Sequence, residues 1–243
     1  MMSQAIKIKS LSKSFGAIDA VCNISFDVGY GEVLGFLGPN GAGKSTTMKM
    51  ITGFLEPTSG TVEVNGHDVL EDPLSVKRSI GYLPEGAPAY GEMTVKSFLN
   101  FIADIRELSG SLRKNRLDEV IETINIGTVI DQSIETLSKG YKRRVGLAQA
   151  ILHDPNILIM DEPTDGLDPN QKHEVRNLIK KMAEKKAIII STHILEEVDA
   201  VCSRAIIISS GKLLFDGTPE QLISKSDQGN IDHAFRNITV PSK

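Results

Sequence analysis

Residues 38–46 combine glycines, a lysine and hydroxyl side chains at a fixed spacing. Gly38, Gly43, Lys44 and Ser45 fill the fixed positions of the pattern G-x-x-x-x-G-K-[ST]. Glycines let a backbone wrap closely enough for its N–H groups to point at phosphate oxygens. Lys44 supplies a positive charge for β- and γ-phosphates, and the Ser45 hydroxyl is a suitable Mg²⁺ ligand. The segment predicts a nucleotide site formed by Gly38, Pro39, Asn40, Gly41, Ala42, Gly43, Lys44, Ser45 and Thr46.

Two adjacent acids, Asp161 and Glu162, follow the apolar run at residues 157–160. If this run is a strand of an α/β sheet, Asp161 emerges at its carboxyl end, where such sheets bind ligands. Asp161 is then placed to hold Mg²⁺ through water beside Ser45, and Glu162 to polarise an attacking water as general base. An apolar run that ends in two acids is, by itself, as often a solvated strand end. The phosphate-binding pattern in the same chain favours the catalytic interpretation.

The segments that flank residues 38–46 predict a strand, a loop and a helix. Residues 33–37 are an apolar strand, and residues 46–51 begin a helix whose positive N-terminal end faces the phosphates. Residues 11–16 predict a turn. Alternating polarity predicts strands with one solvated face at residues 6–9, 23–28 and 61–66. We therefore expect an antiparallel β layer beside a nucleotide-binding α/β core.

A helical subdomain is predicted from about residue 86 to residue 137. Residues 94–108 and 112–124 place apolar side chains at helical spacing. After this insertion helices alternate with strands, and the runs at residues 157–160 and 187–190 are apolar throughout, which is typical of parallel strands covered on both faces. The predicted segments are helices at 139–152, 170–184 and 195–202, and strands at 157–161, 187–191, 205–209 and 212–215.

The predicted fold class is therefore α/β, with one domain over residues 5–225. Thr218 is a plausible N-cap for a last helix that runs to about residue 225. Residues 226–243 form a polar tail, and its pattern does not decide between a frayed end and a short helix.

Composition excludes several classes of protein. The chain has 243 residues, of which 40% are hydrophobic, enough for a sizeable core. A net charge of −4 argues against a nucleic-acid partner. The basic run Lys142–Arg144 is accordingly predicted to be a solvated helix face. Cys22 and Cys202 are in no ligand-like pattern and indicate buried or free thiols in a reducing compartment. Neither a signal-peptide core nor an apolar run long enough for a membrane span is found, so a cytoplasmic protein, soluble or peripheral, is expected.

Further motifs identify a family. Residues 137–141, Leu-Ser-Lys-Gly-Tyr, resemble the L-S-G-G-Q signature of ATP-binding cassette (ABC) proteins. Residues 163–169 resemble the D-loop of that family, His193 stands where its switch histidine ends the next strand, and Phe15 matches the aromatic residue that stacks on adenine. The motifs follow family order and spacing. The resemblance implies a P-loop NTPase of the ABC cassette type, with a RecA-like parallel-sheet core, an antiparallel β layer and a helical signature subdomain.

The resemblance also implies a mechanism. Two cassettes would face head to tail and enclose two ATP molecules, each between the phosphate loop of one chain and Ser138 and Gly140 of the other. ATP and Mg²⁺ are the implied cofactors. The implied partners are a second cassette, which we expect to be another copy of this chain, and an integral membrane permease. The implied catalytic residues are Lys44, Glu162 and His193.

Two departures from the family pattern matter. The strand at residues 80–83 usually leads to a Gln that touches Mg²⁺ and senses the membrane partner, whereas this chain has Glu85. The Leu-Pro-Glu form resembles cassettes of the ABC-2 exporter type, and we expect Glu85, with Ser45 and Asp161, to approach Mg²⁺. Lys139 and Tyr141 replace the usual Gly and Gln of the signature. Since Ser138 and Gly140 are retained, activity is expected, and Lys139 can alter dimer affinity or salt dependence.

The leading interpretation is the ATPase subunit of a membrane ABC transporter, peripheral on the cytoplasmic face of the membrane. A soluble ABC ATPase of translation or DNA repair is the alternative. Such proteins usually carry two cassettes or a long coiled coil, and residues 47–136 contain no heptad run. A non-catalytic regulatory module is disfavoured because Lys44, Asp161, Glu162 and His193 are all present. The cargo stays open, since no residue of this chain has a reason to touch it.

Overall fold

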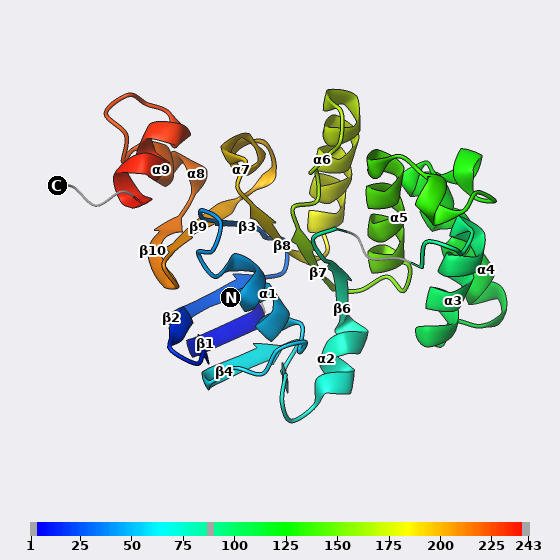
Figure 1. The fold of residues 1–243 in the computed structure, drawn as a ribbon, viewed down its shortest axis with the longest axis horizontal. Helices are drawn as coiled ribbons and strands as arrows, with labels where there is room; N and C mark the ends of the chain where they lie inside the picture. The colour runs from blue at the N-terminus through cyan, green and yellow to red at the C-terminus, as the bar shows by residue number, and fades with distance from the viewer. Residues whose placement is uncertain (1–3, 87–89, 240–243) are drawn as a thin grey trace.

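The computed structural model describes residues 4–86 and 90–239 (Figure 1). The predictions made for residues 1–3, for residues 87–89 of the insertion and for residues 240–243 of the tail lie outside the described residues. The described residues contain a mostly parallel sheet, an antiparallel sheet and a group of helices, as the sequence predicts. The domain boundaries at residues 5 and 225 stay a prediction.

The parallel sheet has the strand order β10-β9-β3-β8-β7-β6, and β10 alone among these strands is antiparallel to its neighbour. In β7, Leu158 and Met160 contribute to the core on one face, whereas Ile157 and Ile159 contribute to the core on the other. This two-sided burial explains why the strand is apolar throughout. The strands are β3 (Val33–Leu37), β6 (Ile80–Leu83), β7 (Ile157–Asp161), β8 (Ala187–Thr192), β9 (Arg204–Ser209) and β10 (Lys212–Gly217).

The antiparallel sheet has the order β2-β1-β4-β5. The turn predicted over residues 11–16 is wrong, because β1 continues to Phe15. Its pairing with β2 shifts register between Ile8 and Leu11, where Ser10 has a φ of 50°. This bulge breaks the alternation of polarity that marks a strand. The strand predicted from that alternation was therefore too short. The strands are β1 (Gln4–Phe15), β2 (Ile18–Gly29), β4 (Ser59–Val64) and β5 (His67–Asp68).

Helices cover both faces of the parallel sheet (Figure 1). On one face α1 (Lys44–Ile51) lies in the core shared with the antiparallel sheet. On the other, α3, α4, α5 and α6 form the second core with β7 and β8. These helices span Val95–Ile105, Gly110–Ile124, Lys139–Ile151 and Pro169–Ala183, and a short α2 spans Pro73–Ser79.

The predicted tail contains a packed helix. Beyond α7 (Leu195–Val201) and α8 (Pro219–Ile223), the helix α9 (Ile231–Thr239) buries Ala234 fully against a third core that includes Leu222. Figure 1 shows α8 and α9 at the opposite end of the molecule from α3 and α4. Within residues 4–86 and 90–239, none of the helices has both the length and the apolar character needed to cross a membrane.

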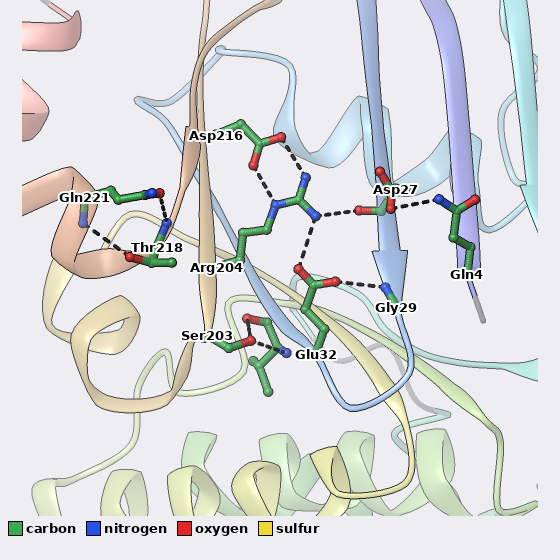
Figure 2. A network of polar contacts seen from close by, with 10 residues as sticks. Gln4, Asp27, Gly29, Glu32, Ser203, Arg204, Asp216, Thr218 and Gln221 are labelled. Carbon is green, nitrogen blue, oxygen red and sulfur yellow. Dashed lines mark hydrogen bonds and ion pairs between the residues drawn. The ribbon is translucent and has the colours of Figure 1, made fainter. Parts of the chain in front are cut away.

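Arg204 joins the two sheets at one edge (Figure 2). Its guanidinium makes two parallel hydrogen bonds to Asp216 of β10, of 2.6 and 2.7 Å. It also donates to the Asp27 carbonyl of β2 at 2.9 Å and to Glu32 at 3.1 Å, and Glu32 accepts from the Gly29 N–H. These hydrogen bonds raise the pKa of Arg204, so it stays charged. The network fixes the antiparallel sheet against the parallel sheet at the amino ends of β3 and β9, the opposite end of these strands from the phosphate loop.

Gly81→Ala is expected to destabilise the fold by about 1–3 kcal/mol, the usual effect of overpacking. A Cβ at Gly81 in β6 would lie 2.1 Å from the Ala150 carbonyl oxygen of α5. Denaturant unfolding measures the effect. Gly127→Ala is the control, because a Cβ there meets nothing closer than 3.7 Å. Equal stability of the two variants would show that α5 does not approach β6 as described.

Candidate active site

Residues 38–43 form the loop between β3 and α1, and residues 44–46 already belong to α1, which begins two residues before its predicted start. Gly43 immediately precedes α1 with a φ of 106°, and a Cβ there would lie 2.4 Å from the Ala20 carbonyl oxygen. Both the backbone conformation and the close approach therefore require glycine. Because the first N–H groups of a helix have no intrahelical partner, the start of α1 is suited to an anion.

Lys44 is the first residue of α1, directly after this loop. Its side chain is 7% exposed, and its ammonium donates to the carbonyl oxygens of Gly38 at 2.7 Å and Pro39 at 3.1 Å. Burial lowers the pKa of Lys44. Three nearby carboxylates oppose this shift and favour the charged ammonium, namely Glu162, Asp161 and Glu85. The loop therefore holds a positive charge where the phosphate-binding pattern predicts one.

A cavity of about 300 Å³ opens beside the loop. It brings Lys44 and Ser45 together with Glu85, from the segment after β6, and with Glu162, from the segment after β7. Residues far apart in the sequence thus meet at the carboxyl ends of three parallel strands of one sheet, where α/β sheets place their ligands. The lining residues are Ala20, Asn40, Gly41, Gly43, Lys44, Ser45, Thr46, Glu85 and Glu162.

The two predicted acids at the end of β7 have different surroundings. Asp161 is 3% exposed and accepts a hydrogen bond from the Ser191 hydroxyl of β8. The Glu162 side chain is more open and accepts a hydrogen bond of 2.7 Å from Nδ1 of His193. Sequence reasoning brought Glu162 and His193 together but missed Ser191, because its pairing depends on the β7–β8 register.

The oxygen ligands at this site suit Mg²⁺. Ser45 offers a hydroxyl and Glu85 a carboxylate in the cavity wall, and Asp161 ends the adjacent strand. Hydroxyl and carboxylate oxygens are the ligands that Mg²⁺ prefers, together with water and substrate phosphates. These residues could hold the metal beside a triphosphate bound along the loop.

Three predicted binding residues that do not belong to the phosphate-binding segment, Ser138, Gly140 and Phe15, do not line the cavity. Ser138 is the N-cap of α5, with its hydroxyl accepting from the Tyr141 N–H at 3.3 Å, and Gly140 belongs to the first turn of that helix. Phe15 ends β1 and is 50% exposed, with the Lys13 ammonium 5.3 Å from its ring centroid. One chain therefore does not bring the signature to its own phosphate loop.

The prediction for the basic run Lys142–Arg144 is wrong. Arg143 is 6% exposed and Arg144 is 7% exposed, so neither belongs to a solvated face. Arg143 donates to backbone carbonyls near the cavity, whereas Arg144 bonds to the Ile124 carbonyl and to Glu174. Charged side chains are rarely buried without partners, and a sequence cannot show partners on other elements.

Known proteins resemble this chain over most of its length. It is 37% identical over 226 residues to the ABC transporter ATP-binding protein YxlF of Bacillus subtilis, which covers 93% of this chain and 75% of YxlF. It is 39% identical to the bacitracin transport ATP-binding protein BcrA of Bacillus licheniformis, over 88% of this chain and 69% of BcrA. A solved structure of the ATP-binding subunit of an ABC transporter superposes with a TM-score of 0.88 at 29% identity, covering 96% of this chain and 99% of that one.

The protein-family model described as ABC transporter matches residues 21–165, a segment that includes the phosphate loop, the signature and the acids that follow β7. More than half of the chain lies in this match. The cofactors are ATP and Mg²⁺, for which the cavity provides a positive loop and oxygen ligands. The chain therefore belongs to the ABC transporter family, as an ATP-binding and ATP-hydrolysing subunit.

Proposed function

We propose that this chain is the ATPase of an ABC-2 type exporter and works as a head-to-tail dimer beneath a separate membrane permease. The observation that carries the proposal is that one chain holds the predicted ATP-binding residues in two separate places, which we call the divided site. The cavity joins the phosphate loop to Glu85 and Glu162, while Ser138 and Gly140 lie outside it. A second chain must bring the signature to complete the phosphate cage.

Residues in the cavity divide the chemistry between them. Lys44 binds the β- and γ-phosphates, and Glu162 takes the proton of the attacking water. His193 donates to Glu162 and keeps its carboxylate oriented. Bound Mg²⁺ would neutralise charge on the phosphates, and Ser45, Asp161 and Glu85 are the residues that hold it.

The signature of the second chain supplies the other half of the cage. Ser138 and Gly140 open α5, a helix of 13 residues, so its N–H groups and its positive end are offered to an anion. In the dimer this end faces the γ-phosphate bound by the partner. ATP then links the two chains, and its hydrolysis at Glu162 releases them.

A second hollow, of about 630 Å³, is proposed to dock the permease. It lies where β6 ends, beside α3, and Tyr82 and Pro84 in its wall directly precede Glu85. An apolar groove rimmed by exposed aromatic residues accepts an amphipathic helix. Its lining residues are Lys49, Phe54, Tyr82, Pro84, Tyr90, Phe98, Phe101, Ile102, Ile105, Arg106 and Gln149. We call this hollow the permease groove. A cytoplasmic helix of the permease bound in it would contact the segment that carries Glu85.

The exporter assignment has two supports. The Leu83-Pro84-Glu85 segment has the form found in ABC-2 exporter cassettes, and one relative is named for bacitracin transport. We infer export for this chain from these two supports together, with the protein peripheral at the cytoplasmic face of the membrane.

Ile105→Asp is expected to weaken permease binding about tenfold or more, because a docked apolar helix face would remove the new carboxylate from water. The measurement is a pull-down of tagged Glu162→Gln protein from detergent-solubilised membranes with ATP, read by mass spectrometry. Leu112→Asp is the matched control, since Ile105 and Leu112 are 58% and 57% exposed in the same group of helices and Leu112 does not line the groove.

A stoichiometric protein with several membrane spans, retained by the Leu112→Asp control and lost with Ile105→Asp, would support the transporter and the groove together. Ribosomal or DNA-repair proteins, with no membrane protein captured, would instead support the soluble ABC ATPase. Equal capture by both variants would place the permease elsewhere on the chain.

A further inference from the structure

Arg143 of α5 connects two separate loops at the active site. Its guanidinium donates to the carbonyl of Pro84 at 2.9 Å, in the loop that follows β6. It also donates to the carbonyl of Asp161, the last residue of β7, and to those of Glu162 at 2.5 Å and Pro163 at 3.4 Å, in the loop that follows this strand. A planar guanidinium with several fixed N–H donors is suited to hold carbonyls that approach from different directions.

The backbone that Arg143 holds is an unfavourable one. Glu162 has a φ of 53°, in the left-handed region that non-glycine residues seldom adopt. Such a conformation persists where the surroundings fix it from several sides. The Glu162 N–H donates to the Ser191 carbonyl at 2.9 Å, and the Glu162 carbonyl accepts from the Asp165 N–H at 3.1 Å and from Arg143. The direction of the Glu162 side chain therefore depends on these contacts.

Arg143 remains charged in this position. Burial lowers the pKa of Arg143, and the nearby carboxylates Asp161, Asp165, Glu162 and Glu85 oppose that shift. A charged donor makes stronger hydrogen bonds than a neutral one. Arg143 thus ties the helix that begins at the signature to both carboxylate-bearing loops.

We propose that Arg143 is a positioning residue for ATP hydrolysis: it fixes the Glu162 backbone and couples it to the loop of Pro84 and Glu85. The proposal rests on the proposed role of Glu162 as general base. Pro84 also lines the permease groove, so the same hydrogen bonds join that groove to the site of hydrolysis. If a docked helix displaced Pro84 by less than an ångström, the Arg143 side chain would transmit that shift to the Glu162 backbone.

Arg143→Met tests the proposal in steady-state hydrolysis by the full chain. The kcat is expected to fall about tenfold to a hundredfold, while the KM for ATP changes by less than about twofold, since the phosphate loop is untouched. Arg143→Lys is expected to restore part of the loss, because an ammonium can reach one loop but lacks the guanidinium fork.

Arg144→Met is the matched control. Arg144 is the next residue of the same helix and is equally buried, but its bonds go to Ile124 and Glu174 and to neither loop. The two Met variants are compared for thermal unfolding and for kcat per folded molecule. Arg144→Met is expected to lose stability but to retain kcat within about threefold.

A double-mutant cycle decides between positioning and a general structural effect. If Arg143 acts through Glu162, Arg143→Met adds little further loss in the Glu162→Gln background. Three outcomes would each overturn the proposal. The first is a double variant whose loss of kcat equals the product of the two single losses. The others are a raised KM with unchanged kcat in Arg143→Met, and an equal loss of kcat in Arg144→Met. Full hydrolysis by Glu162→Gln alone would overturn instead the role of Glu162, whatever Arg143→Met does.

Discussion

Glu162→Gln protein is expected to bind ATP, to dimerise and to hydrolyse ATP about 10²–10⁴-fold more slowly than the unchanged chain. The amide keeps the shape of the side chain and an oxygen that can accept from Nδ1 of His193. It cannot take a proton from water, so ATP stays intact and the dimer that it links persists. Light scattering with saturating ATP measures the dimer, and phosphate release measures hydrolysis.

Glu184→Gln serves as the control for this experiment. Glu184 is an exposed acid that follows α6 and does not line the nucleotide cavity, so the same change of charge should leave hydrolysis intact. A Glu162→Gln protein that stays monomeric with saturating ATP would show that two copies of this chain do not pair. A different cassette would then have to provide the signature.

The sequence predicted most of the parallel sheet and its loop because both depend on local patterns. Apolar runs such as Ile157–Met160 require burial on both faces, and the phosphate-binding segment is marked by four residue types at a fixed spacing in one short motif. The same local logic placed Thr218 correctly as an N-cap, with a capping box that includes Gln221.

One local element, α2, was missed, and another, β1, was predicted too short, because their signals are weak. The helix α2 spans seven residues and buries only Val76, so it has no apolar period to detect. Its start is nonetheless marked by Asp72, which accepts from the Ser75 N–H, followed by proline at the first position. In β1 the bulge at Ser10 interrupted the alternation that had located the strand.

Long-range polar contacts outside the family motifs could not be predicted. Arg143 stands in a basic run that any solvated helix could carry, and its partners come from the ends of β6 and β7. Ser191 meets Asp161 because β7 and β8 pair in one particular register. The sequence motifs thus identified the groups expected to bind ATP and take up protons, and the tertiary structure revealed the groups that hold them in place.

Lys44→Ala is expected to lower ATP affinity about 100-fold, because each charge-assisted bond to a phosphate contributes about 1.5–3 kcal/mol. Calorimetric titration measures the affinity, and ATP should raise the Tm of the unchanged chain but not of this variant. Lys49→Ala is the control, since Lys49 is exposed in the last turn of α1 and does not line the nucleotide cavity.

The Lys44 and Glu162 variants differ in a way that tests the divided site itself. Both residues line one cavity, and both substitutions are expected to slow hydrolysis. Loss of ATP binding in Lys44→Ala should leave the chain monomeric at ATP concentrations that make Glu162→Gln fully dimeric. If Lys44→Ala dimerised equally well, the contacts between the chains would not depend on bound phosphates, and Ser138 and Gly140 would need another role.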